Sequence, residues 1–170
     1  MFVLFSGALR AEETSKDFVV GGFVFTAPKK WEMQKTSSPM RKAEFKVLED
    51  KTQAVAEVVF FYFGPGQGGS AAENVARWKS QVKDLTKEKV EEREVGGTKV
   101  TLVKFEGSYQ SGMPGGPKVP QAGAALWGAV LEGAQGNVFV RLTGPKDWVE
   151  KIGNEFDAMI ESGAKNKRSN

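Results

Sequence analysis

The sequence predicts an α+β fold, in which a mainly antiparallel sheet is covered by two main helices. Short stretches that alternate apolar and polar side chains, separated by glycine or proline turns, fill most of the chain. Only two stretches, one starting at Ser70 and one at Gly144, carry apolar side chains at helical spacing. Without an internal repeat or a linker, the pattern indicates one domain over residues 18–163. The polar tail 164–170 is expected to be a solvated end.

The strand patterns are clearest in the first half of the chain. Residues 19–25 predict two strands joined at Gly21-Gly22, and residues 54–63 predict a longer one. The apolar run 58–63 indicates that this longer strand is buried on both faces, near the centre of the sheet. Further strands are expected at residues 31–34, 40–47, 88–95, 98–109, 122–131 and 137–142. Gly96-Gly97 and residues 133–136 are typical of hairpin turns.

Two helices are expected, each with a recognisable start. Ser70 followed by Glu73 forms a capping-box pattern. Apolar side chains at helical spacing then define a buried face: Val75, Trp78, Val82 and Leu85. The second helix begins at Gly144 to Asp147, with Pro145 in its first turn, and ends near Gly163. Its expected buried face consists of Trp148, Ile152, Phe156, Met159 and Ile160.

Composition excludes several classes of enzyme. The chain has 170 residues, of which 40% are hydrophobic and 26% charged, with a formal net charge of +3. It contains no cysteine and no histidine, which excludes Ser-His and Cys-His hydrolases and zinc sites built on those ligands. Charges of both signs are interleaved and no basic stripe with aromatics occurs, so nucleic acid is not an expected partner. No calcium-loop spacing is present. We therefore expect no metal, no cofactor and no catalytic residues.

The N-terminal residues 1–11 resemble the end of a secretory signal. Apolar residues 1–5 precede the small residues around Ala8 and Ala11, after either of which cleavage is expected. A first β-strand or a leader without regular structure is the alternative. No other stretch approaches the length of a membrane span. This pattern predicts an exported protein, periplasmic or secreted.

A glycine-rich loop lies between the strand 54–63 and the helix that begins at Ser70. Gly64 and Gly69-Ser70 have the spacing of a phosphate-binding loop, but the lysine that such a loop needs is missing. Free amides at the helix start can still bind an anion, although Glu73 competes for them. The alternative interpretation is a tight turn followed by a capped helix.

A second loop, residues 110–121, is rich in glycine and proline, and long loops in compact domains are often functional. The alternative is a flexible hairpin connection. If the two loops met at one end of the sheet they would form a groove for a small ligand. The ligand-binding residues predicted on this basis are Gly66, Gln67, Gly68, Gly69, Ser70, Met113 and Lys118.

Strand glutamates are the remaining candidates for chemistry. Glu44, Glu57 and Glu106 would be acids or bases if burial raised their pKa, or structural groups if they paired with basic side chains. The available basic partners are Arg41, Lys46, Lys104 and Arg141. A deep pocket lined by Glu57 or Arg141 would favour ligand binding or a carboxylate-dependent enzyme, whereas a flat exposed apolar patch would favour a protein partner. The tryptophans are expected to fill the core, with a ligand-stacking cluster as the alternative.

Two motifs carry a family resemblance. The first is Phe-Val-Phe-Thr-Ala-Pro-Lys-Lys-Trp at residues 23–31. The second is the strand 138–142 followed by Thr-Gly-Pro-Lys-Asp-Trp and a helix. With the element order, they resemble the PsbP-like family of extrinsic photosystem proteins and its relatives, which include Mog-type factors that bind the Ran GTPase. The loop 64–70 with Trp78 is similar to exported bacterial proteins of that design. The histidines that bind metal in some PsbP-like proteins are missing here.

The resemblance implies an α/β/α sandwich that serves as a binding or assembly module. The sequence therefore predicts a non-catalytic exported protein of the cell envelope that acts through protein–protein contacts. The alternative is a binder of a small ligand in a groove near the loops 64–70 and 112–120. A carboxylate-dependent enzyme is the third hypothesis.

Overall fold

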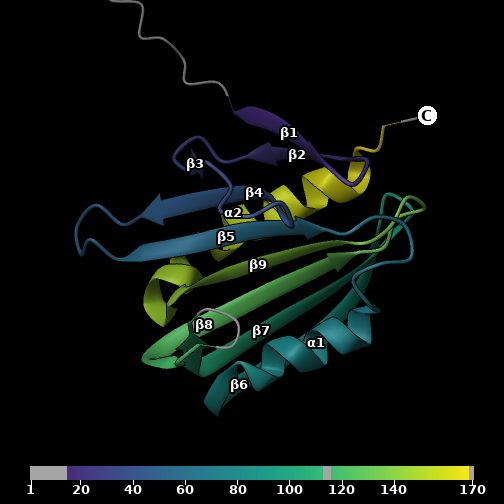
Figure 1. The fold of residues 1–170 in the computed structure, drawn as a ribbon. Helices are drawn as coiled ribbons and strands as arrows, with labels where there is room; N and C mark the ends of the chain where they lie inside the picture. The colour runs from purple at the N-terminus through teal and green to yellow at the C-terminus, as the bar shows by residue number, and fades with distance from the viewer. Residues whose placement is uncertain (1–14, 113–115, 169–170) are drawn as a thin grey trace, which may run out of the picture.

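A computed structural model describes residues 15–112 and 116–168 (Figure 1). The predicted signal segment, residues 1–11, lies outside these residues. The strands are β1 (Lys16–Val20), β2 (Phe23–Ala27), β3 (Glu32–Gln34), β4 (Arg41–Leu48), β5 (Val55–Tyr62), β6 (Val82–Val95), β7 (Thr98–Ser111), β8 (Val119–Leu131) and β9 (Val138–Pro145). The helices are α1 (Ala71–Ser80) and α2 (Lys146–Lys165).

Seven strands form one antiparallel sheet in the order β3-β4-β5-β9-β8-β7-β6, and β1 and β2 form a separate hairpin. The last strand of the chain, β9, lies at the centre of the sheet between β5 and β8. The predicted α+β class, with a central antiparallel sheet and two main helices, is confirmed. The long apolar strand is β5, an interior strand whose Val58, Val59 and Phe60 are buried from both faces.

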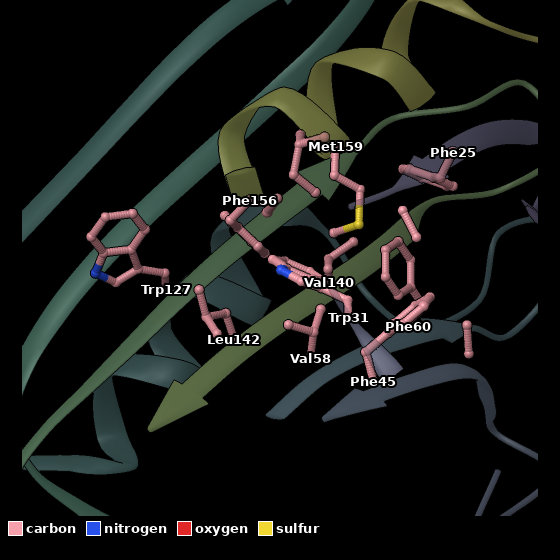
Figure 2. Packing of buried hydrophobic residues seen from close by; sticks show 14 of the residues in the cluster. Phe25, Trp31, Phe45, Val58, Phe60, Trp127, Val140, Leu142, Phe156 and Met159 are labelled. Carbon is pink, nitrogen blue, oxygen red and sulfur yellow. The ribbon is translucent and has the colours of Figure 1, made fainter. Parts of the chain in front are cut away.

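One face of the sheet is covered by α2 and the β1–β2 hairpin, with a continuous aromatic core between the layers (Figure 2). Phe60 lies at its centre, with ring centroids 5.0 Å from Phe18, 4.9 Å from Phe25 and 6.2 Å from Phe45. Two indole donors also connect this layer. Trp31 Nε1 donates to Glu155 of α2 at 2.8 Å, and Trp148 Nε1 of α2 donates to the Val47 carbonyl oxygen at 2.8 Å. This face therefore contains the larger part of the hydrophobic core.

The opposite face carries α1, which packs mainly against the half of the sheet formed by β6, β7 and β8 (Figure 1). A smaller buried cluster lies beneath the helix: Trp78, Val82, Val103, Phe105, Leu126, Val130 and Phe139. Neither helix of the described residues covers β3 to β5, at the other end of the sheet, on this face. The two faces of one sheet are thus covered to different extents.

Adjacent residues of β8 hold both helices close to the sheet. Gly128 faces α1, and a Cβ at this position would lie 2.5 Å from the Trp78 ring. Trp127 faces α2, where a Cβ on Gly153 would lie 2.4 Å from its ring. In each layer a tryptophan ring therefore rests on a glycine, at a distance that no larger residue permits. This arrangement explains the burial of Trp78 and Trp127, which the sequence predicted as core residues.

The first helix is shorter than the spacing predicted, because Val82 and Leu85 belong to β6 and not to α1. The capping box at its start is confirmed. The register between β6 and β7 shifts between Lys83 and Lys87, at an irregularity that includes Asp84 with a φ of +50°. A bulge of this kind changes which residues share a face. Val82 and Leu85, three residues apart, consequently both pack on the cluster beneath α1, and they mimic helical spacing.

The C-terminal residues also differ from the prediction. Helix α2 continues to Lys165, beyond Gly163, and Pro145 precedes it instead of lying in its first turn. The next residues pair with the β1–β2 hairpin and do not form a free tail. Val24 N donates to the Asn166 carbonyl at 2.8 Å, and Arg168 N donates to the Gly22 carbonyl at 2.9 Å. Backbone groups that find partners in a neighbouring strand are held in place, so the described part of the tail belongs to the domain.

Candidate functional site

The glycine-rich loop after β5 is a sharply turned connection whose Gly64, Gly66, Gly68 and Gly69 all have positive φ. At its end Ser70 caps α1. The Glu73 carboxylate accepts hydrogen bonds from Ser70 N at 2.7 Å and from Ser70 Oγ at 2.8 Å. Both hydrogen bonds lower the pKa of Glu73 below 4.5, and the bond from the Ser70 backbone contributes more than the bond from its hydroxyl. A carboxylate of the chain itself therefore lies where an anion would approach the helix start.

The predicted residues of this loop have different surroundings. Gly66 and Gln67 are exposed. Gly68 lies against aromatic rings, because a Cβ there would be 2.6 Å from both Phe63 and Phe139. Its carbonyl accepts a hydrogen bond from Asn74 Nδ2 at 2.9 Å. These contacts show a packed strand-to-helix turn, and a ligand-binding role for the loop stays a prediction.

The two loops lie at opposite ends of the sheet, so the predicted shared groove is wrong. The first loop follows the end of β5 and contacts the β8–β9 turn, where a Cβ on Gly136 would lie 2.6 Å from the Gly64 carbonyl oxygen. The second loop lies near Val55, at the start of β5, because Gly112 and Val55 line one hollow. The antiparallel pairing of the strands places the two loops at opposite ends of the sheet. The order in which the strands pair could not be predicted from the sequence alone. Met113 lies outside the described residues, and Lys118 is exposed just before β8.

The second loop does border a pocket of about 430 Å³ on the face that carries α1, beyond the half that the helix covers. Its polar side chains come from five strands: Arg41, Glu57, Tyr109, Ser111, Gln121, Arg141 and Thr143. Glu57 and Arg141 were the residues whose presence in a pocket would favour ligand binding. Their convergence follows from the register, which places Glu57 opposite Thr143 and Val59 opposite Arg141.

Arg41 is the fully paired cation of this region. Its Nη1 lies 3.1 Å from Glu57 Oε1 and 3.3 Å from Glu44 Oε2. Glu44 also accepts hydrogen bonds from Ser37 N at 2.6 Å and Ser37 Oγ at 2.8 Å. Burial raises the pKa of Glu44, but the hydrogen bonds from Ser37 and the charge of Arg41 outweigh it and hold the pKa below 4.5. Glu44 and Arg41 thus form an ionised, structural pair.

Arg141 has a different environment. Its Nη1 donates to Gln81 Oε1 at 3.3 Å, and its guanidinium carbon lies 5.6 Å from the centre of the Phe61 ring. Its Nε is buried without a hydrogen-bond acceptor, and no carboxylate of the described residues lies within ion-pair distance. Arg41 approaches the same ring at 5.9 Å, so Phe61 lies between two guanidinium groups.

Glu106, the other buried strand glutamate, lies on the face that carries α2. Lys87 Nζ is 3.0 Å from its Oε1, and Lys146 Nζ is 3.6 Å from its Oε2. Burial raises the pKa of Glu106, yet the hydrogen bond and charge of Lys87, with the charge of Lys146, hold it below 4.5. Both fully buried strand glutamates are therefore paired anions, as the structural alternative predicted. Within residues 15–112 and 116–168 no cluster of three or more metal-binding side chains occurs.

Around the pocket, the uncovered half of the sheet exposes a mixed surface. Leu48 and Val55, paired across β4 and β5, are 43% and 45% exposed. We call the outward side chains of this half the open face: Glu44, Lys46, Leu48, Val55, Glu57, Phe61, Arg141 and Thr143. The sequence identified Glu57 and Arg141, and it included Gln121 in the candidate loop 110–121, but it missed Tyr109 and Thr143. Only the pairing of β7, β8 and β9 brings these last two to the pocket.

No helix in the described part of the chain combines the length and apolar character needed to cross a membrane. No protein-family model matches the sequence, and no curated protein matches it. The solution structure of cyanobacterial PsbP (CyanoP) from Synechocystis sp. PCC 6803 is similar in fold, with a TM-score of 0.57 and 15% sequence identity. The match covers 94% of this chain and 96% of that chain. The predicted resemblance is thus confirmed at the level of the fold: this chain has a PsbP-like α+β architecture.

Proposed function

We propose that this chain is a non-catalytic binding protein that is exported to the cell envelope and contacts an acidic partner protein through its open face. The observation that carries the proposal is the unequal covering of the sheet. One face is closed by α2 and a hairpin, while half of the other face exposes Leu48, Val55 and two arginines beside a pocket. An exposed apolar surface rimmed by polar groups is typical of an interaction site.

The sheet edges support contact through this face and not by strand addition. The edge strand β6 carries mostly charged side chains, and the other edge strand, β3, has three residues. Both features discourage pairing with an added strand. An acidic partner is favoured by the formal net charge of +3 and by the guanidinium of Arg141, which has no carboxylate partner among the described residues.

The proposed export rests on the signal-like sequence of residues 1–11. The proposal also includes the resemblance of the sequence to Mog-type factors and to exported bacterial proteins. The non-catalytic character is supported by the paired, ionised state of Glu44 and Glu106. A second candidate function is the binding of a small ligand near the loop 112–120. The pocket of about 430 Å³ favours it, since this volume lies in the range of ligand sites.

Two exposed valines allow a matched test of the face. Val55 is 45% exposed on the open face, and Val90 is 48% exposed on β6, beyond α1. We expect Val55→Lys to reduce the recovery of specific partners from a native envelope extract, because the lysine interrupts the apolar contact. Val90→Lys should recover the same partners as the wild type. Quantitative mass spectrometry of the captured proteins makes the comparison.

A third variant tests the glycine loop. Gly66 is exposed and a Cβ there meets no neighbour, so Gly66→Asp adds charge to the loop without a clash, although its φ of +68° strains the residue. We expect unchanged capture by this variant. Equal capture by Val55→Lys and the wild type, or loss of partners only with Gly66→Asp, would contradict the proposal.

A further inference from the structure

Arg141 is a half-buried cation whose hydrogen-bonding capacity is incompletely used. Its Nη1 has a single weak acceptor, Gln81 Oε1 at 3.3 Å, and its Nε has none. A buried donor on a charged group that loses water without gaining an acceptor destabilises the protein. Such unsatisfied groups occur at functional sites, where a ligand supplies the missing partner.

The neighbouring Arg41 shows what a compensated guanidinium looks like in the same surroundings. It contacts the same Phe61 ring, yet it lies within 3.3 Å of two carboxylates, those of Glu44 and Glu57. Among the described residues, carboxylates thus pair with one arginine and not with the other. Because both guanidiniums line the pocket, the uncompensated one is available to a molecule that enters it.

The pocket also holds neutral groups that can bind a second oxygen. Tyr109 and Thr143 line it with Arg141, and neither side chain hydrogen-bonds to another described residue. An ionised carboxylate has two oxygens with about four lone-pair positions that accept hydrogen bonds. Arginine binds such a group through two parallel N–H donors, and adjacent hydroxyls can satisfy the remaining lone pairs.

The charge of the lining favours a monoanion. Arg41 is already balanced by Glu44 and Glu57, so Arg141 supplies the single positive charge that a ligand in the pocket would meet. A phosphate monoester carries about −1.5 to −2 charges near neutral pH and would be repelled more strongly by Glu57. A cation would meet Arg141 directly. We therefore expect the ligand to present a single carboxylate group to the pocket.

We infer that the pocket between Arg41 and Arg141 is a carboxylate-binding site, in which the Arg141 guanidinium takes the carboxylate of an acidic side chain on the partner protein. This inference rests on the proposed function for the source of the carboxylate, but the site itself does not. Arg41 keeps its two glutamates and positions Phe61, whose ring lies between the guanidiniums. Tyr109 and Thr143 border the bound oxygens.

The full chain, labelled with nitrogen-15, allows a direct test through the side-chain Nε–H signals of arginine. The probes are sodium acetate, sodium phosphate, and end-blocked Gly-Gly-Glu-Gly-Gly with its Gly-Gly-Gln-Gly-Gly counterpart. We expect acetate and the glutamyl peptide to move the Arg141 signal, while the glutaminyl peptide leaves it in place. Arg141→Gln should weaken binding of the glutamyl peptide roughly tenfold or more, because the charged, two-point contact is lost.

Arg77 offers a matched control. Its Nη1 also donates to a side-chain amide oxygen at 3.3 Å, that of Asn74, but it lies on α1 outside the pocket. Arg77→Gln removes the same charge and should leave binding unchanged. Arg141→Lys should recover only part of the affinity, since lysine lacks the planar fork. Thermal unfolding of each variant shows whether a loss of binding merely reflects loss of the fold.

Two results overturn the inference: an Arg141 signal unmoved by acetate and by the glutamyl peptide, or a folded Arg141→Gln protein that binds as well as the wild type. A stronger response to phosphate overturns the choice of a monoanion. If the Arg141 signal responds to acetate but not to the glutamyl peptide, the claim that a side chain of the partner protein supplies the carboxylate is wrong. The proposed function fails separately, when Val55→Lys and the wild type capture the same proteins. The proposed function stands without the carboxylate site if Val55→Lys loses the captured proteins while the Arg141 variants keep them.

Discussion

The two faces of the central sheet differ in how completely the chain covers them. On the face with α2, aromatic and aliphatic side chains form one continuous buried cluster, and the buried Glu106 has two lysine partners. On the face with α1, half of the sheet stays open and Arg141 has no carboxylate partner among the described residues. The difference teaches that one face supplies most of the stability, and that the other is free to carry recognition.

Consecutive residues of β5 offer the most direct way to break this comparison. Phe60 is fully buried on the α2 face, and its neighbour Phe61 is half-buried on the open face. We expect Phe60→Ala to lower the free energy of unfolding by about 3–5 kcal/mol, because it leaves a cavity among three other rings. Phe61→Ala should cost about 1–2 kcal/mol, since water already reaches part of its ring. Urea unfolding measures both values, and equal losses would contradict the division between the faces.

The tryptophan–glycine contacts of β8 give the next largest effect. A methyl group on Gly128 would overlap the Trp78 ring, and one on Gly153 would overlap the Trp127 ring. We expect Gly128→Ala and Gly153→Ala each to destabilise the protein by about 1–3 kcal/mol, because rigid rings must move. Circular dichroism during thermal unfolding monitors both. The exposed Gly66, where a Cβ meets no neighbour, provides the control substitution to alanine. Little change at Gly128 would mean that α1 rests loosely on its face.

The smallest effect concerns the compensated charge of Glu106. Its pKa is below 4.5 in the folded chain, so its pairing stabilises the protein above that pH, and the stabilisation is lost as pH falls through the folded pKa. We expect Glu106→Gln to cost about 1–2 kcal/mol near neutral pH, since both lysine partners are partly exposed. The difference from the wild type should vanish under acidic conditions. Urea unfolding across the acidic range checks this, and a pH-independent difference would mean that the glutamate acts through packing alone.

Much of the fold followed from local patterns. The alternation of β4 and β7, the apolar run of β5, the capping box at Ser70 and the hairpin at Gly96-Gly97 depend on neighbouring residues, and all are present. Val82 and Leu85 misled the helix prediction because a bulge in β6 gives strand residues the spacing of a helix. That error is local, and the shared packing face of the two residues was still correct.

The candidate site was predictable only in part, because it depends on strand order. Glu57 and Arg141 stood out as charges within apolar strands, which can be recognised without a structure. Tyr109, Gln121 and Thr143 carry no such signal. They reach the pocket only because the last strand, β9, inserts between β5 and β8. The same insertion of β9 separates the two glycine loops, and this strand order could not be predicted from the sequence.

The pairing of the C-terminal residues with the β1–β2 hairpin has a consequence for biosynthesis. Thr26 N donates to Ser162 Oγ at 3.0 Å, and Val24 and Gly22 bond to residues 166 and 168. These backbone groups of β2 and of the turn before it thus lack their partners until almost all the rest of the described chain has left the ribosome. Because such distant contacts form late, nascent chains should stay protease-sensitive until these residues emerge.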